Sequence, residues 1–221
     1  MAHPSPDCPA PVLVLASTSP RRRQLLTEAG IAHIAISPGI DDAVLAPGRV
    51  HVAAWVAALA YLKARAGALR MAGDECVPPA DSRPSIGATT LVLGADTLCV
   101  QDGVIIGQAR DENQARRILQ GFSGRRHEVI TGVALVRPDG ERVTMFVDRA
   151  SVDMGVLTAR DIENYLAGGA WRGKAGAYNL TERLEAGWPI RFDGDPTTIV
   201  GLPMLRLRAF LERFGLRGAA A

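Results

Sequence analysis

Residues 14–26 read Val-Leu-Ala-Ser-Thr-Ser-Pro-Arg-Arg-Arg-Gln-Leu-Leu, an apolar run followed by hydroxyl side chains, a proline and three arginines. Proline is favoured in the first turn of a helix and serine at the position before it, so the stretch predicts a strand that leads directly into a helix. The N–H groups and the dipole at such a helix start attract anions. Arg21, Arg22 and Arg23 add forked donors that match phosphate oxygens. The stretch therefore predicts a polyphosphate site, and the alternative is a solvated basic first turn.

The same alternation of strand and helix patterns continues along the chain. Short apolar runs indicate strands, and apolar residues at helical spacing, such as Trp55, Leu59 and Leu62, indicate helices. We expect strands at Val12–Ala16, Ile31–Ile36, Thr89–Leu93, Leu98–Val100, Val104–Ile106, His127–Val136 and Arg142–Val152, and helices at Pro20–Ala29, Val50–Arg70, Asp111–Leu119, Thr158–Leu166 and Leu205–Phe214. Hairpin signals at 101–103 and 137–140 add antiparallel pairs, so the predicted fold class is α/β with a mixed sheet.

Length and composition restrict the class of protein. A chain of 221 residues can form one large domain or two lobes. We expect one domain over residues 12–221, a disordered tail at 1–11, and a surface insertion at about 71–88 where Pro, Gly, Asp and Ser are frequent. The formal net charge of +2 is too small to indicate nucleic-acid binding, and the three cysteines lack metal-site spacing and fit a reducing cytoplasm. No apolar run is expected to approach the roughly 20 residues of a membrane span.

A second chemical motif is Gly94-Ala95-Asp96-Thr97, which follows a predicted buried strand. Aspartate is disfavoured in strands, and the rim of an α/β sheet is where such proteins bind ligands. Asp96 is therefore a candidate metal ligand or water-activating base, and a turn aspartate that caps local N–H groups is the alternative. Asp41 and Asp42 form an acidic pair in the loop at 37–48. Either one of them completes a Mg²⁺ site with Asp96, or the pair belongs to a solvated acidic loop.

Three further segments contain residues that are candidates for ligand binding. Lys63, on the long helix, is within possible reach of a phosphate, although most helical lysines only solvate a face. After Ser123-Gly124-Arg125-Arg126, His127 and Thr131 share one strand face, where a phosphate or sugar contact competes with a structural role for the histidine. The glycine-rich segment 173–178, Gly-Lys-Ala-Gly-Ala-Tyr, lets the backbone approach a ligand closely or allows tight packing between two lobes.

In this order the segments resemble the Maf family of nucleoside triphosphate pyrophosphatases. The resemblance covers about residues 12–214 and rests on Ser17-Thr18-Ser19-Pro20-Arg21-Arg22, Asp42, Lys63, Gly94-Ala95-Asp96-Thr97, Ser123-Gly124-Arg125 with His127, Val129 and Thr131, Lys174-Ala175-Gly176-Ala177-Tyr178 and Val200-Gly201-Leu202-Pro203. It implies a mixed, twisted sheet in two lobes around a central cleft, similar to the fold of the inosine triphosphate pyrophosphatases. It also implies hydrolysis of a nucleoside triphosphate to the monophosphate and pyrophosphate, and a link to the removal of non-standard nucleotides.

The resemblance also implies roles for individual residues. Asp96 matches the family's proton acceptor, which acts with a divalent metal (Mg²⁺ or Mn²⁺), and Asp42 stands where the family usually has a glutamate metal ligand. Lys63 would assist catalysis. The candidate substrate-binding residues are Ser17, Ser19, Arg21, Arg22, Thr97, Gln108, Arg125, His127, Lys174 and Thr181. The implied partners are the nucleotide and a second copy of the chain in a cytoplasmic homodimer, with no nucleic acid and no membrane.

Two positions depart from the family pattern. Gln108-Ala109 stands where the family usually has Lys-Pro, so one phosphate cation is missing. A charged contact of this kind is worth about 1.5–3 kcal/mol, or roughly tenfold to a hundredfold in rate. Arg110 is a candidate substitute, although an uninterrupted strand would point it to the opposite face. Thr181 replaces a glutamine associated with cleavage of dTTP and UTP, and so argues against that substrate class. The alternative function is a catalytically weak nucleotide-binding regulator.

Overall fold

The computed structural model describes residues 12–41, 45–72 and 90–218. The expected tail at 1–11, most of the expected insertion at 71–88 and the predicted metal ligand Asp42 lie outside these ranges. A seven-stranded sheet has the order β2-β1-β3-β5-β6-β7, with β4 beside β3. The strands are β1 Leu13–Ala16, β2 His33–Ile36, β3 Leu91–Gln101, β4 Val104–Ile106, β5 Arg126–Val136, β6 Arg142–Met154 and β7 Ile190–Asp193. The helices are α1 Pro20–Glu28, α2 Val52–Ala72, α3 Glu112–Phe122, α4 Ala159–Ala167, α5 Leu180–Glu185, α6 Pro196–Val200 and α7 Met204–Glu212.

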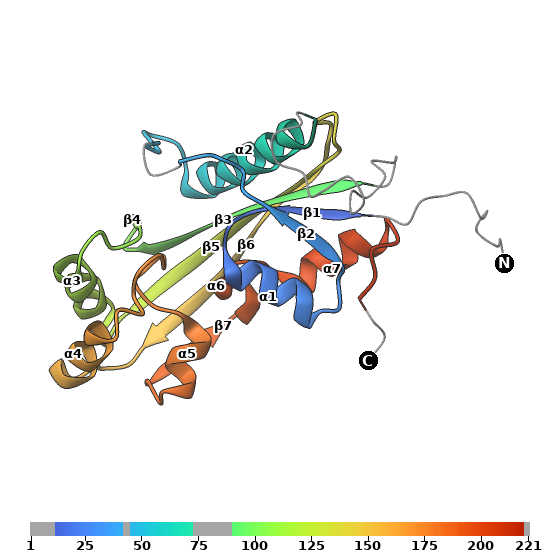
Figure 1. Ribbon diagram of the computed structural model, residues 1–221. Helices are drawn as coiled ribbons and strands as arrows, with labels where there is room; N and C mark the ends of the chain where they lie inside the picture. Colours follow the sequence, from blue (N-terminus) through green and yellow to red (C-terminus); the bar gives the residue numbers. More distant parts are fainter. Residues whose placement is uncertain (1–11, 42–44, 73–89, 219–221) are drawn as a thin grey trace.

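The predicted α/β class with a mixed sheet is confirmed. β1 pairs with β2 and β3 in parallel, and the other pairs are antiparallel. Helices cover both faces of the sheet (Figure 1): α2 lies on one face, and α1, α6 and α7 lie on the other. One buried cluster joins β1 and β3 to α1 and α7, and another joins α3 and α4 to the far ends of β5 and β6. The two clusters form the cores of two lobes.

The predicted strand Thr89–Leu93 is wrong at its C-terminal end. β3 continues through Asp96 to Gln101 because β5 pairs with it from Val92 to Val100. This long-range pairing outweighs the low strand propensity of aspartate, which depends on context. Asp96 therefore lies within a strand, opposite Gly132 of β5, and not in a terminal turn.

The sequence patterns did not predict α5, β7 or α6, which have six, four and five residues. The two helices span fewer than two turns, too few residues to show a helical period. Side chains at their starts hold the two helices: Asn179 accepts a hydrogen bond from Glu182 N, and Asp195 accepts one from Thr197 N. β7 is held by its pairing with β6.

α2 packs directly on the sheet because two glycines leave room for its backbone. A Cβ atom at Gly94 of β3 would lie 2.2 Å from the carbonyl oxygen of Ala60, and one at Gly132 of β5 would lie 2.5 Å from that of Val56. Since real Cβ atoms do not approach backbone this closely, larger residues at these positions would push the helix away. Leu59 is buried but Leu62 is exposed, and small residues such as Ala64 face the sheet.

α2 also corrects the expectation about membrane spans. At 21 residues it is long and apolar enough to cross a membrane by length and composition alone. Its buried residues, however, pack against β1, β3 and β5, as Figure 1 shows for the helix as a whole. α2 is a core helix, and its apolar character follows from that packing.

Candidate active site

The main cavity lies where strand pairing along β3 is interrupted. β1 pairs with β3 only as far as Leu93, and β4 pairs with it only from Cys99. Because β5 occupies the other edge over this whole range, β1 and β4 share one edge. Within the described ranges, no strand pairs with this edge between residues 94 and 98. A cavity of about 500 Å³ opens here, and the predicted site residues that line it are Ser17, Ser19, Arg21, Arg22, Lys63, Asp96, Thr97 and Gln108.

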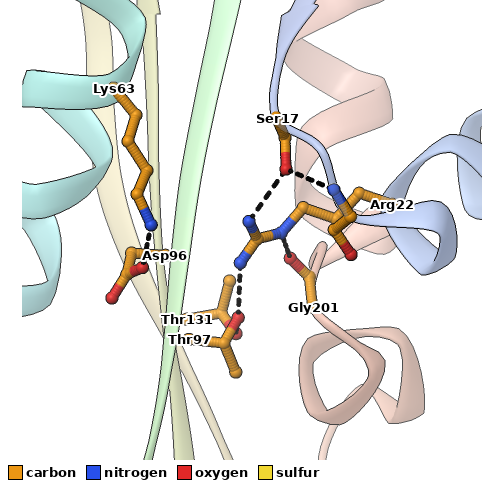
Figure 2. Close-up of polar contacts among 8 residues, drawn as sticks. Ser17, Arg22, Lys63, Asp96, Thr97, Thr131 and Gly201 are labelled. Carbon is orange, nitrogen blue, oxygen red and sulfur yellow. Dashed lines mark hydrogen bonds and ion pairs between the residues drawn. The ribbon is translucent and has the colours of Figure 1, made fainter. Parts of the chain in front are cut away.

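The open edge makes both faces of β3 accessible to one ligand. Asp96 and Thr97 follow one another in the strand, so their side chains point to opposite faces. Figure 2 shows Lys63 and Asp96 on the α2 side of β3, and Arg22, Ser17 and Thr97 on the other side. All five side chains nevertheless line the same cavity. A ligand that lies across the edge therefore contacts the carboxylate side and the arginine side at once.

An ion pair occupies the α2 side. Lys63 Nζ lies 2.6 Å from Asp96 Oδ1, and the two side chains are 12% and 8% exposed. In so dry a position each charge compensates the other, and removing either would leave a buried charge without its partner. The close packing of α2 on Gly94 and Gly132 brings the lysine within this distance. Lys63 thus orients the Asp96 carboxylate at the cavity.

On the other side Arg22 joins three separate parts of the chain. Its guanidinium donates from Nε to Gly201 O at 2.9 Å, from Nη1 to Ser17 Oγ at 3.2 Å and from Nη2 to Thr97 Oγ1 at 3.1 Å. Ser17 Oγ also accepts a hydrogen bond from the backbone N–H of Ser19. Ser19 lies at the predicted cap position of α1, but its side chain makes no capping bond. The hydroxyl that organises the helix start is therefore that of Ser17.

Arg21 reaches from α1 to the opposite wall of the cavity. Its Nη2 donates to Gly173 O at 3.3 Å, and burial lowers its pKa from the ordinary value. The glycine-rich segment that begins there also contacts the residues that follow β4: Gln108 forms a β-bridge with Ala175, and Gly176 N donates to Gly107 O at 3.1 Å. This segment closes the cavity on the side away from α2.

Two residues that were predicted to bind the substrate lie behind the cavity wall. His127 is 2% exposed, its Nε2 lies 2.8 Å from Tyr178 Oη, and its ring stacks on Phe122. Burial lowers the pKa of His127 to about 4, so the imidazole is neutral at pH 7. Lys174 is buried and pairs with Glu182. His127 therefore fixes Tyr178, which does line the cavity, and Lys174 anchors the first turn of α5.

Three other predicted residues also lie outside the cavity lining. Arg125 is exposed and precedes β5, seven residues from Gly132, which corresponds to roughly 20 Å along an extended strand. Thr181 is exposed in the first turn of α5. Arg110, the candidate substitute for the missing lysine, is exposed beside α3.

Several lining residues had no individual signal in the sequence. They are Cys99, Arg172, Asn179 and Ile199. Their positions follow from strand register and from the unpredicted elements α5 and α6, so only their nearness to the glycine-rich segment could have indicated Arg172 and Asn179.

The donor set fits a metal that is held mainly by its substrate. The described residues contain no group of three or more His, Cys, Asp and Glu side chains suited to a metal. Asp96 is the acidic side chain among the described residues that line the cavity. Mg²⁺ commonly takes one or two carboxylates and completes its shell with phosphates and water, so a single buried carboxylate beside the arginines of the cavity suits it.

Comparisons with known proteins identify relatives over nearly the whole chain. A family model described as Maf-like protein matches residues 12–214. A protein of Symbiobacterium thermophilum named dTTP/UTP pyrophosphatase is 37% identical and covers 92% of this chain and 94% of its own length. Proteins with the same name from Shewanella frigidimarina and a Geobacillus species are each 36% identical, covering 90% and 92% of this chain and 95% and 98% of their own. A dITP/XTP pyrophosphatase structure from Mycobacterium abscessus is 16% identical, with a TM-score of 0.37 over 66% of this chain and 76% of its own, too distant to support an argument.

Proposed function

The chain belongs to the Maf-like protein family, and on that premise we propose that it hydrolyses dTTP and UTP between the α- and β-phosphates. Family membership makes it a nucleoside triphosphate pyrophosphatase, and the proposal concerns its substrates and the roles of its residues. The products would be the nucleoside monophosphate and pyrophosphate. One observation supports this most: the basic start of α1 and the Asp96 carboxylate line a single cavity.

In this proposal Asp96 accepts the proton of the attacking water. The water oxygen forms a bond to phosphorus, the α–β anhydride bond breaks, and pyrophosphate leaves. Lys63 holds the carboxylate in position through the ion pair at 2.6 Å. Ser17 and Arg21 line the cavity beside it, where their donors suit phosphate oxygens, and Thr97 accepts the hydrogen bond that holds Arg22 there. The enzyme thereby supplies the base, the positioning and the charge neutralisation that phosphoryl transfer requires.

We also propose that a divalent cation, Mg²⁺ or Mn²⁺, binds at Asp96 together with the substrate phosphates. Asp42, the second predicted ligand, lies outside the described residues. When bound, such an ion neutralises phosphate charge and makes its coordinated water more acidic.

The two departures from the family pattern do not oppose this proposal. Gln108 lacks the charge of the usual lysine. Arg172 lines the same cavity and precedes Ala175, the β-bridge partner of Gln108, by three residues. We therefore propose that Arg172 supplies the missing positive charge. Thr181 is exposed and lies outside the cavity lining, so its identity is no argument against dTTP and UTP. We further propose that the enzyme acts as a cytoplasmic homodimer.

The test is a pyrophosphate-release assay with standard and modified triphosphates in Mg²⁺ or Mn²⁺. We expect dTTP and UTP to be the preferred substrates. Asp96→Asn should lower kcat by about 10³-fold, because general-base catalysis typically contributes this much, while nucleotide affinity stays within about tenfold.

Asp102→Asn is the matched control. Asp102 is an exposed residue of the β3–β4 turn with a φ of 50°, a conformation that asparagine also adopts, so activity should not change. Tight nucleotide binding without product from any triphosphate would contradict the proposal and favour a regulator.

A further inference from the structure

The two ends of the cavity differ in chemistry. One end holds the start of α1, Lys63 and Asp96. Three residues further along β3, Cys99 pairs with Val129, and both belong to the buried cluster of the second lobe, as does Tyr178. Three residues of strand span about 10 Å, which is the separation a nucleotide needs between its phosphates and its base. The apolar end, where the flat Tyr178 side chain forms part of the wall, is suited to a base.

Asn179 is the polar side chain that enters this apolar end from the start of α5. It is 8% exposed and lines the cavity next to Tyr178. Its Oδ1 accepts a hydrogen bond from the backbone N–H of Glu182 at 3.0 Å. A backbone N–H can only donate, so the atom that meets it must be the amide oxygen, and the orientation of the side-chain amide is fixed by chemistry.

The fixed oxygen leaves the amide NH₂ group as the part of Asn179 that can meet a ligand. Within the described part of the chain, Asn179 Nδ2 has no hydrogen-bond partner. The group is a pure donor, and it cannot exchange roles with the oxygen without losing the α5 cap. With its oxygen turned to Glu182 N, Asn179 offers the two N–H donors of its amide as the unsatisfied polar group at this end of the cavity.

We propose that Asn179 is the specificity-determining residue that reads the keto oxygen of the base. The inference rests on the proposed function and adds the rule by which bases are chosen. Uracil and thymine carry a carbonyl at C4, which accepts from the asparagine NH₂. Cytosine carries an amino group at the same position, so two donors would face each other and both would lose their hydrogen bonds. The site therefore selects keto bases over amino bases, whichever residue stands at position 181.

UTP and CTP are the sharpest probes because they differ only at this edge of the base. We expect kcat/KM for UTP to exceed that for CTP by at least tenfold. Asn179→Asp keeps an oxygen that can cap α5 but replaces the NH₂ donor by an acceptor, so the UTP:CTP ratio should fall at least tenfold. Asn179→Ser also keeps a capping oxygen without adding charge, and should bring the ratio towards one.

The control is Asp111→Asn, which changes the capping residue of α3 at an exposed position outside the cavity lining. It should leave the ratio unchanged. Binding of UMP and CMP, measured by calorimetry, reads the same preference without catalysis. If the wild type releases no pyrophosphate but binds UMP over CMP, the proposed function fails and the inference stands. If both Asn179 variants keep the wild-type UTP:CTP ratio, in turnover or in binding, the inference is overturned while the pyrophosphatase activity stands.

Discussion

The two faces of β3 at the cavity are built in opposite ways. On the α2 face, Gly94 and Gly132 have no side chains, so the helix backbone can approach the sheet and place Lys63 against Asp96. On the other face, side chains are added: Arg22 donates to Ser17, Thr97 and Gly201, and Thr97 and Thr131 bond to each other at 2.9 Å. The first face depends on close packing, and the second depends on hydrogen bonds.

This difference predicts different weaknesses. Added volume should damage the α2 face, because the helix has no room to yield without losing its contact with the sheet. Lost donors should damage the arginine face, because oxygens buried there would lose their partners. The first two predictions below test this contrast, and a third, with the smallest expected effect, tests a buried histidine of β5.

Gly132→Val should have the largest effect. Its Cβ would lie 2.5 Å from Val56 O, so α2 must move away and the Lys63–Asp96 ion pair must lengthen. We expect a loss of about 3 kcal/mol or more in the free energy of unfolding, since overpacking against backbone is among the most costly changes. Urea unfolding followed by circular dichroism measures it.

Gly121→Ala is the control for added volume. Its Cβ would lie 3.5 Å from Gln101 Oε1, an ordinary contact, and alanine favours the α3 helix more than glycine does. Stability should stay equal or rise. Equal stability of Gly132→Val and the wild type would disprove the close packing of α2.

Arg22→Lys should have the intermediate effect. Lysine keeps the charge, but its single ammonium cannot reproduce the geometry of the guanidinium that contacts Ser17, Thr97 and Gly201. We expect a loss of about 2 kcal/mol in unfolding free energy and an increased KM, because the start of α1 loses its attachment to β3. Arg23→Lys, at the exposed neighbouring position, should stay within about 0.5 kcal/mol. A comparable loss in both variants would refute the specific role of Arg22.

His127 gives the smallest effect, as a pH dependence. It lies on the same face of β5 as Thr131, and burial lowers its pKa to about 4 from 6.5. Below pH 6.5 the unfolded chain binds a proton that the folded chain excludes, so this contribution to stability is present above that pH and is lost as the pH falls towards 4. Between pH 7 and 5.5 the loss should be about 1 kcal/mol.

His127→Gln removes the titrating group, so the difference in its unfolding free energy between pH 7 and 5.5 should be smaller than in the wild type by that amount. An unchanged difference would show that the histidine titrates normally. Urea titrations at the two pH values make the comparison.

Local patterns predicted the longer elements well. Pro20 before an apolar repeat marks the start of α1, and Thr158 with Asp161 forms the capping box of α4. Turn residues at 101–103 mark the hairpin of β3 and β4, with Asp102 and Gly103 at positive φ. These signals involve residues two to four positions apart, so the sequence contains them directly. The extension of β3 through Asp96 was missed because it depends on pairing with β5.

The candidate site was predicted in part. The basic start of α1 and Asp96 do line one cavity, as the argument from charge required. The side chain that enters the cavity from α5 is Asn179, whereas Thr181 lies outside the lining, and Lys174 and His127 lie behind its wall. Residues in one motif diverge in this way because a turn or a strand directs neighbouring side chains to different sides.

The sequence by itself determined the chemistry of this protein: a run of arginines at a helix start, an aspartate in an apolar segment, and the order of motifs that marks the family. Only the tertiary structure decided which side chains contact each other at the site. Asp96 meets Lys63 across 33 positions of sequence, Thr97 meets Arg22 across 75, and Gly201 meets Arg22 across 179. Such contacts are set by strand register and by the glycines under α2, and these act through packing of the whole sheet, which no local pattern encodes.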